Sequence, residues 1–170
     1  MNFNTPFVIE HYESGTASLD DRLEAARKVQ DAKGFRLRIV IEPIIKYPNY
    51  EKDYVELAGR IMRSLDPERI EEIAMGCVRY SGRLEARVRR NFPETDLFTE
   101  AQGLLPQVKN DRRRYPLDER VRLYKMVHEE FRKHTKVYIR LGAETADVWE
   151  ALCWDSSAFM QKSAYQFPGK

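Results

Sequence analysis

Two strand-like segments, each lying between helix-like segments, restrict the possible folds of this chain more than any other feature. Residues 35–45, FRLRIVIEPII, alternate apolar and polar side chains before Pro43 closes the strand. Residues 70–80, IEEIAMGCVRY, form a second apolar run that ends near Tyr80. The apolar positions that share one face of the first strand are Phe35, Leu37, Ile39 and Ile41. The order helix, strand, helix, strand, helix predicts an α/β fold with a parallel sheet and right-handed crossovers.

Three helices frame these strands. Ser18 is placed to cap the first helix, which Gly34 ends, and its apolar positions are Leu19, Leu23, Ala26 and Val29. The second helix, before the LDPERI stop signal, has an apolar stripe of Tyr54, Leu57, Ile61 and Leu65. The third helix begins at Ser81 and runs to about Asn91, before Pro93.

The rest of the chain continues this organisation. Residues 93–114 have no clear period and are predicted to be a long loop. A long helix follows from Leu117 to Phe131, then a third strand in KVYIRLG and a short helix in TADVWEALC. We therefore expect one domain over residues 1–154 and a poorly ordered tail over 155–170. Residues 1–4 look like the end of a strand and residues 7–12 like a loop, so we expect the chain to start inside a sheet.

Composition excludes several classes of protein. No apolar run reaches the ~20 residues of a membrane span, and no signal peptide precedes the first helix, which favours a cytoplasmic protein without a membrane partner. Cys77 and Cys153 are far apart and form no CxxC pair. We expect two buried, inert thiols and no metal site.

The middle of the chain is basic. Residues 79–125 contain 12 Lys/Arg and 7 Asp/Glu, whereas residues 1–78 contain 11 and 14. Helical spacing puts one arginine stripe on the third helix, and a run of arginines with an adjacent aromatic follows the long loop. Such a patch suits DNA phosphates and an unstacked base; the alternative is a solvated helix face and a surface loop. The nucleic-acid-binding candidates are Arg79, Arg83, Arg87 and Arg90 on the stripe and Arg112, Arg113, Arg114 and Tyr115 after the loop.

Two phrases connect the chain to a known family. Residues 11–22 contain HYE-x-GT-x-S-x-x-x-R, and residues 43–47 contain PII-x-Y. With their order and spacing over residues 1–92, and with VYIRLGAETADVWEAL further on, the sequence resembles the spore photoproduct lyase-like branch of the radical SAM enzymes.

The resemblance implies a partial TIM-like barrel, of which this chain is the back, C-terminal half with about three parallel strands. The complete family protein binds a [4Fe-4S] cluster through a CxxxCxxC loop in its front half. S-adenosylmethionine ligates the cluster, and the resulting radical reverses a thymine dimer in DNA. The chain contains no CxxxCxxC motif. We therefore expect no cofactor in this chain alone.

The resemblance also suggests where a cofactor-facing site would lie. Asn2 falls where the family has a strand-end serine-x-asparagine near S-adenosylmethionine. Glu42 ends a strand near the same position, where the lyases proper have a small residue and other branches an acidic one, which puts the lyase reaction in doubt. The alternative for Glu42 is an internal ion pair with Arg38, which lies on the same strand face. His11 in HYE is either a ligand contact or a solvated cap.

These observations lead to three hypotheses. The first is the C-terminal portion of a radical SAM enzyme of DNA repair that is not catalytically complete alone, with no catalytic residue assigned. The others are a non-catalytic domain that binds nucleic acid or a partner chain, and a vestigial fold. An open sheet edge beside Phe3 and Phe7, and apolar inner positions such as Ile39 or Ile41, favour self-association or pairing with a separate N-terminal half.

Overall fold

The computed structural model describes residues 1–32, 35–99, 105–107 and 112–152. Its centre is a three-stranded sheet of β1 (Leu37–Ile44), β2 (Ile70–Cys77) and β6 (Tyr138–Leu141) in the order β1-β2-β6. Both strand pairs are parallel, as the sequence predicts. The backbones of Met1 and Phe3 also hydrogen-bond to Val40 of β1, so residues 1–4 extend the sheet beside β1.

Helices separate these strands along the chain. The predicted helices are confirmed as α2 (Leu19–Asp31), α3 (Tyr50–Ser64), α4 (Gly82–Asn91), α5 (Leu117–His134) and α6 (Ala146–Leu152), with a 3-10 turn at Pro67–Arg69. Ser18 forms a reciprocal capping box with Asp21, and Ser81 caps α4. Gly34, Cys153 and residues 155–170 lie outside the described residues, so the predicted helix end and tail are not tested.

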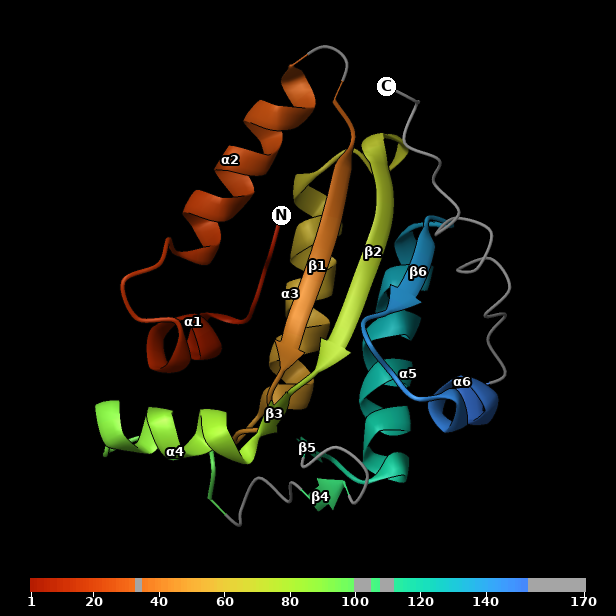
Figure 1. Cartoon of the computed structure of the whole chain (residues 1–170). Coiled ribbons are helices and arrows are strands. Elements are labelled where there is room, and N and C mark those ends of the chain that lie inside the picture. Colours follow the sequence, from red (N-terminus) through yellow and green to blue (C-terminus); the bar gives the residue numbers. More distant parts are fainter. Residues whose placement is uncertain (33–34, 100–104, 108–111, 153–170) are drawn as a thin grey trace, which may run out of the picture.

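Helices cover one face of the parallel sheet. Figure 1 shows α3 and α5 behind β1, β2 and β6, and the two helices contact each other. Apolar side chains of the strands point toward this layer and are almost fully buried: Ile39, Ile41, Ile73, Met75, Ile139 and Leu141. Ile39 and Ile41 therefore do not form an exposed inner patch, because they belong to the core. Phe35, predicted to share their face, precedes β1 and is 60% exposed.

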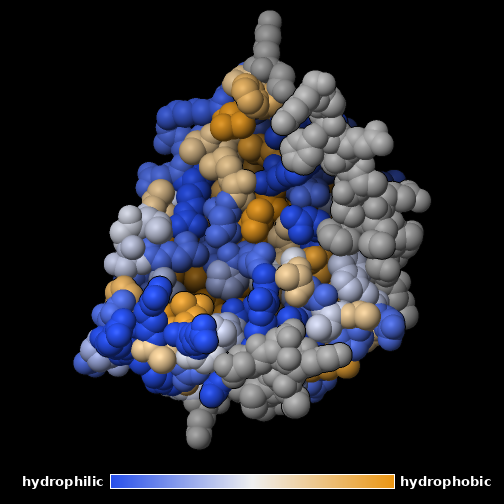
Figure 2. Space-filling model, in the orientation of Figure 1, coloured by the Kyte–Doolittle hydropathy of each residue, from blue (hydrophilic) through white to orange (hydrophobic). Residues whose placement is uncertain are grey.

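The opposite face of the sheet is not covered by α3 or α5. The pairing register places Arg38 and Val40 of β1 beside Glu72 and Ala74 of β2, and β6 contributes Tyr138 and Arg140. Glu72 and Arg140 form an ion pair at 3.1 Å. In Figure 2 hydrophilic and hydrophobic residues are mixed over this side of the molecule. The open face is thus lined by charged as well as apolar groups.

The predicted loop at residues 7–12 is wrong, because Pro6–Tyr12 form helix α1. The hydroxyl of Thr5 accepts a hydrogen bond from Val8 N, and Pro6 occupies the first turn. Both are standard signals of a helix N-terminus. Phe7 and Tyr12, the aromatic residues of this segment, instead pack one side of a short helix against the core.

Two further corrections concern residues 78–114. The second predicted strand ends at Cys77, and Arg79–Ser81 form a separate strand, β3. The predicted long loop contains β4 (Leu105–Gln107) and β5 (Arg112–Arg114). These short strands form an antiparallel sheet in the order β3-β5-β4. Strands of three residues are too short to give a recognisable alternation in sequence.

The confirmed architecture is a mixed α/β fold around a parallel sheet, and its continuation into a TIM-like barrel stays a prediction. In the part of the chain that the structure describes, no helix is long and apolar enough to cross a membrane.

Candidate nucleic-acid interface and strand-end pocket

Glu42 lies at the carboxyl end of β1, where its side chain extends over the neighbouring strand. Two glycines provide the space. A Cβ on Gly76 would lie 2.6 Å from Glu42 Cδ, and a Cβ on Gly142 would lie 2.8 Å from Glu42 Oε2. Any larger residue at either position would push the carboxylate away. The sequence therefore builds a recess at the ends of β2 and β6 that the carboxylate of Glu42 fills.

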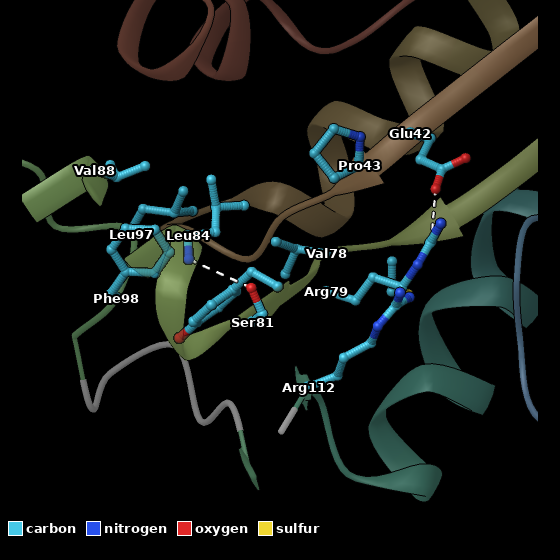
Figure 3. Close-up of a pocket in the computed structure, with 12 residues that line it drawn as sticks. Glu42, Pro43, Val78, Arg79, Ser81, Leu84, Val88, Leu97, Phe98 and Arg112 are labelled. Atoms are coloured by element: carbon cyan, nitrogen blue, oxygen red, sulfur yellow. Dashed lines mark hydrogen bonds and ion pairs between the residues drawn. The ribbon is translucent and has the colours of Figure 1, made fainter. Parts of the chain in front are cut away.

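Glu42 is paired with Arg79, not with Arg38. Glu42 Oε1 lies 2.6 Å from Arg79 Nη1, and the same nitrogen donates to the carbonyl of Gly142 at 3.4 Å (Figure 3). Arg38 pairs with Glu71 at 2.9 Å across to β2. The predicted Glu42–Arg38 pair is wrong because β3 brings a closer guanidinium to the strand end. Arg79 likewise does not belong to the α4 stripe, since it lies in β3.

The small antiparallel sheet gathers arginines on one of its faces. Arg79 pairs in register with Arg114, and Ser81 pairs with Arg112. Because directly opposite residues point to the same side of a sheet, these four side chains share a face. Arg113, opposite Tyr80, points to the other side and contacts Glu85 of α4 at 3.4 Å. The predicted RRR run is therefore divided between two faces.

The two arginines of β5 on the shared face differ in their partners. Arg114 contacts Glu144 at 3.5 Å. Burial lowers the pKa of Arg114, and the positive charges of Arg120, Arg79 and Arg112 lower it further, against the opposing effect of Glu144. Arg112 is exposed and forms no ion pair with any residue that the structure describes. In Figure 3 its side chain points toward that of Arg79.

A pocket of about 500 Å³ lies between these strand ends and α4. Its volume lies in the range of sites for small organic molecules. One side is polar, with Glu42, Arg79, Ser81 and Arg112; the other is apolar, with Leu84, Val88, Leu97 and Phe98 (Figure 3). Phe98 packs edge-to-face on Tyr80 at 4.5 Å between ring centroids. The pocket combines cations with apolar surface.

A hydrogen-bond network fixes the turn beside the pocket. The amide of Asn2 donates to the carbonyl of Glu42, and that of Asn4 donates to the carbonyl of Pro43, each at 3.0 Å. The Tyr54 hydroxyl donates to Asn4 Oδ1 at 3.0 Å and accepts from Ile45 N at 2.9 Å. The two residues predicted to face a cofactor, Asn2 and Glu42, are thus in direct contact. Asn4 and Tyr54 had no distinguishing signal in the sequence.

The HYE segment has structural partners. His11 Nδ1 lies 2.8 Å from the carbonyl of Phe7, and its ring stacks on Phe7. Tyr12 donates to Asp96 at 2.8 Å, and Glu13 pairs with Arg22 at 2.6 Å. These contacts match the capping alternative for His11.

The structure does not bring all predicted nucleic-acid contacts together. Arg83, Arg87 and Arg90 are exposed on α4, as a helix stripe requires. Tyr115 is only 2% exposed, and its hydroxyl accepts from Lys46 N at 2.9 Å. It therefore cannot stack on a base without leaving the core. The aromatic rings that line the pocket are instead Tyr80 and Phe98, which are buried and form part of its apolar wall. The lack of periodicity around Phe98 concealed its place.

Cys77 is buried, as predicted. Burial raises the pKa of its thiol well above the ordinary value, and Cys153 lies outside the described residues. Within the described residues, no group of three His, Cys, Asp or Glu side chains is arranged to hold a metal ion.

Comparisons with known proteins agree on one relationship. Residues 1–153 match the family model of spore photoproduct lyase. A spore photoproduct lyase of Geobacillus sp. is 30% identical over 135 residues, which are 73% of this chain and 39% of that protein. A spore photoproduct lyase of Bacillus subtilis is 29% identical over 99 residues, 57% of this chain and 29% of that protein. The chain therefore spans about two fifths or less of these relatives.

Solved structures show the same fold. A spore photoproduct lyase complexed with dinucleoside spore photoproduct has a TM-score of 0.71 at 24% identity. The similarity covers 83% of this chain and 43% of that one. A doubly substituted spore photoproduct lyase with bound AdoMet and dinucleoside spore photoproduct has a TM-score of 0.70 at 24% identity, over 85% of this chain and 43% of that one.

Proposed function

Because the chain belongs to the spore photoproduct lyase family, we propose that it is the C-terminal portion of a DNA-repair protein of the radical SAM type. In this proposal its own contribution is to bind single-stranded DNA in the pocket at the carboxyl ends of the β-strands. Repair of the lesion is the activity of the whole family protein, of which this chain carries the strand-binding part.

The exposed guanidinium of Arg112 at the pocket is the main support for this proposal. This guanidinium lacks an ion-pair partner among the described residues and lines the pocket with Arg79. A guanidinium without a carboxylate partner is available for a phosphate oxygen, and bidentate contacts of this type are strong. The apolar side of the pocket offers contact to an unstacked base through Leu84, whose side chain is exposed.

The chain's own residues do not fit an iron-sulfur cluster. Three cysteine thiolates must bind three irons of the cluster so that the fourth iron is left for S-adenosylmethionine, and the whole sequence has two cysteines. We therefore propose no step through a cluster on this chain. Asn2 and Glu42 remain our proposed residues on the side that faces S-adenosylmethionine in the family protein, supported by their contact at the carboxyl end of β1.

Fluorescence anisotropy with a labelled oligothymidylate tests strand binding. We expect weak binding that weakens as salt increases. Arg112→Ala should lower the slope of log affinity against log salt by about one unit, because one phosphate contact is lost. Arg36→Ala is the matched control, since Arg36 precedes β1 at the opposite end of the sheet. No binding at low salt, or equal effects of the two substitutions, would contradict the proposal.

A further inference from the structure

The Glu42–Arg79 pair has a second implication, which rests on the proposed strand binding. We propose that Glu42 is a resident counterion that occupies the phosphate-binding position of Arg79, and that a phosphate of the bound strand takes its place. Glu42 then sets the affinity of the pocket for anions. The pocket is built to exchange one anion for another at Arg79.

The degree of exposure separates this pair from the buried Arg120–Glu144 pair. The side chains of Arg79 and Glu42 are 25% and 30% exposed. Arg120 and Glu144, which pair at 2.5 Å, are 8% and 4% exposed. Breaking the second pair would leave a charge buried without a partner, at a large energetic cost. Of these two pairs, Glu42–Arg79 is the one that is exposed enough for a phosphate oxygen to reach the guanidinium.

The surrounding charges favour an incoming anion. Arg112 and Arg114 share a face of the small sheet with Arg79, and Arg114 lies directly opposite Arg79 in the register. Like charges opposite each other in a sheet are unfavourable. Glu144 offsets Arg114 and Glu42 offsets Arg79, whereas Arg112 has no carboxylate partner among the described residues. A phosphate between Arg79 and Arg112 would reduce this repulsion and contact both guanidiniums.

The recess gives Glu42 a defined position from which it competes. Gly76 and Gly142 leave room for its carboxylate over the strand ends. A glutamine at position 42 has nearly the same shape and fits the same recess, but it lacks the charge that competes with phosphate. Glu42→Gln therefore removes the competitor while it preserves the packing.

Salt dependence provides a specific readout. In the native protein, a phosphate that reaches Arg79 displaces a carboxylate, so the contact adds little net neutralisation of phosphate charge. In Glu42→Gln, Arg79 has no carboxylate to lose, so the same contact neutralises one phosphate charge. We expect the affinity for oligothymidylate to rise by about three- to tenfold and the salt slope to steepen by about one unit. A pair that serves only to hold β3 in place would give neither change.

Glu71→Gln is the matched control. Glu71 pairs with Arg38 at 2.9 Å and is 34% exposed, so its substitution changes the net charge and removes a similar ion pair away from the pocket. We expect it to change affinity by less than about twofold. In the double variant Glu42→Gln/Arg79→Gln, the gain should disappear, because the guanidinium that receives the phosphate is gone.

Calorimetric titration with inorganic phosphate at constant ionic strength separates this inference from the proposed strand binding. Tighter phosphate binding by Glu42→Gln than by the native protein or Glu71→Gln supports the exchange, even if neither protein binds the oligonucleotide, in which case only strand binding fails. A different result would overturn the exchange: the native protein binds the oligonucleotide, and Glu42→Gln binds it no more tightly although its circular dichroism spectrum is unchanged. A gain that persists in the double variant would also overturn it.

Discussion

Arg120 Nη1 lies 2.5 Å from Glu144 Oε2, and both side chains are almost completely buried. Glu144 also accepts a 2.5 Å hydrogen bond from the Tyr124 hydroxyl, which in turn accepts from Cys77 N. One carboxylate after β6 thus ties together α5 and the end of β2. The contact of Arg114 with the same carboxylate extends this connection to the small sheet.

Glu144→Ala should destabilise the protein strongly. It leaves Arg120 buried without its main partner, and removal of one member of a buried pair typically costs about 3–5 kcal/mol. Glu56→Ala is the control, because Glu56 and Arg63 form an exposed pair whose loss should cost less than about 1 kcal/mol. Urea denaturation of both variants measures the difference, and equal free energies of unfolding would show that Glu144 does not carry this role.

Tyr54→Phe tests the network beside the pocket. The substitution keeps the fully buried ring but leaves Ile45 N without its acceptor and Asn4 Oδ1 without one donor. An unsatisfied buried group costs about 1–3 kcal/mol. Tyr50→Phe, whose hydroxyl contacts partly exposed acids and Arg122, should cost less. Thermal unfolding of both variants compares them, and a larger loss for Tyr50→Phe would contradict the network.

Much of this architecture could be predicted from the sequence, whereas the pairing of its charged groups could not. The Ser18 capping box and the alternation over Leu37–Ile41 are local signals, and the structure confirms α2 and β1. The Glu42–Arg79 contact depends on the break of the strand at Val78, which turns Arg79 back toward β1. That break has no local signature, because the strand-like pattern continues to Tyr80.

Tyr115 shows the same limit for the proposed interface. Its position after three arginines is consistent with both an exposed aromatic and a buried one. Its burial depends on Lys46, which is 69 residues away in the chain and whose backbone N–H it binds. By contrast, the Thr5-Pro6 start of α1 was present in the sequence as a local signal.

His128 should make stability depend on pH. Burial and the charge of Arg132 lower the pKa of His128 from 6.5 to about 4. The unfolded state therefore takes up the proton first as pH falls, so this contribution is present above pH 6.5 and is lost between pH 6.5 and about 4. Because the ring is partly exposed, we expect a loss of roughly 1–2 kcal/mol.

Urea denaturation at several pH values measures this contribution as a difference between the native protein and His128→Gln. The variant should lose less stability over this pH interval, since it has no imidazole to protonate. Identical pH dependence in the two proteins would contradict the role of His128.

The edge of the parallel sheet should promote association. Val40 N donates to Met1 O at 2.9 Å, and Phe3 N donates to Val40 O at 2.8 Å, so residues 1–4 pair with β1 on one side. No described strand pairs with their other side. We propose that another chain, either a separate N-terminal portion or a second copy, pairs there. Sedimentation velocity should show mass increasing with concentration, and a monomer at every concentration would contradict self-association.

The most direct test of DNA binding at the pocket is to locate the bound oligonucleotide on the protein. Photo-cross-linking with an oligothymidylate that carries 5-iodouracil, followed by mass spectrometry, identifies the contacted peptides. We predict cross-links to the α4 peptide that carries Leu84, whose side chain is exposed at the pocket, and a marked reduction in Arg112→Ala but not in Arg36→Ala. Cross-links confined to α2, α3 or α5, unchanged in Arg112→Ala, would show that the strand does not bind at the carboxyl ends of the sheet.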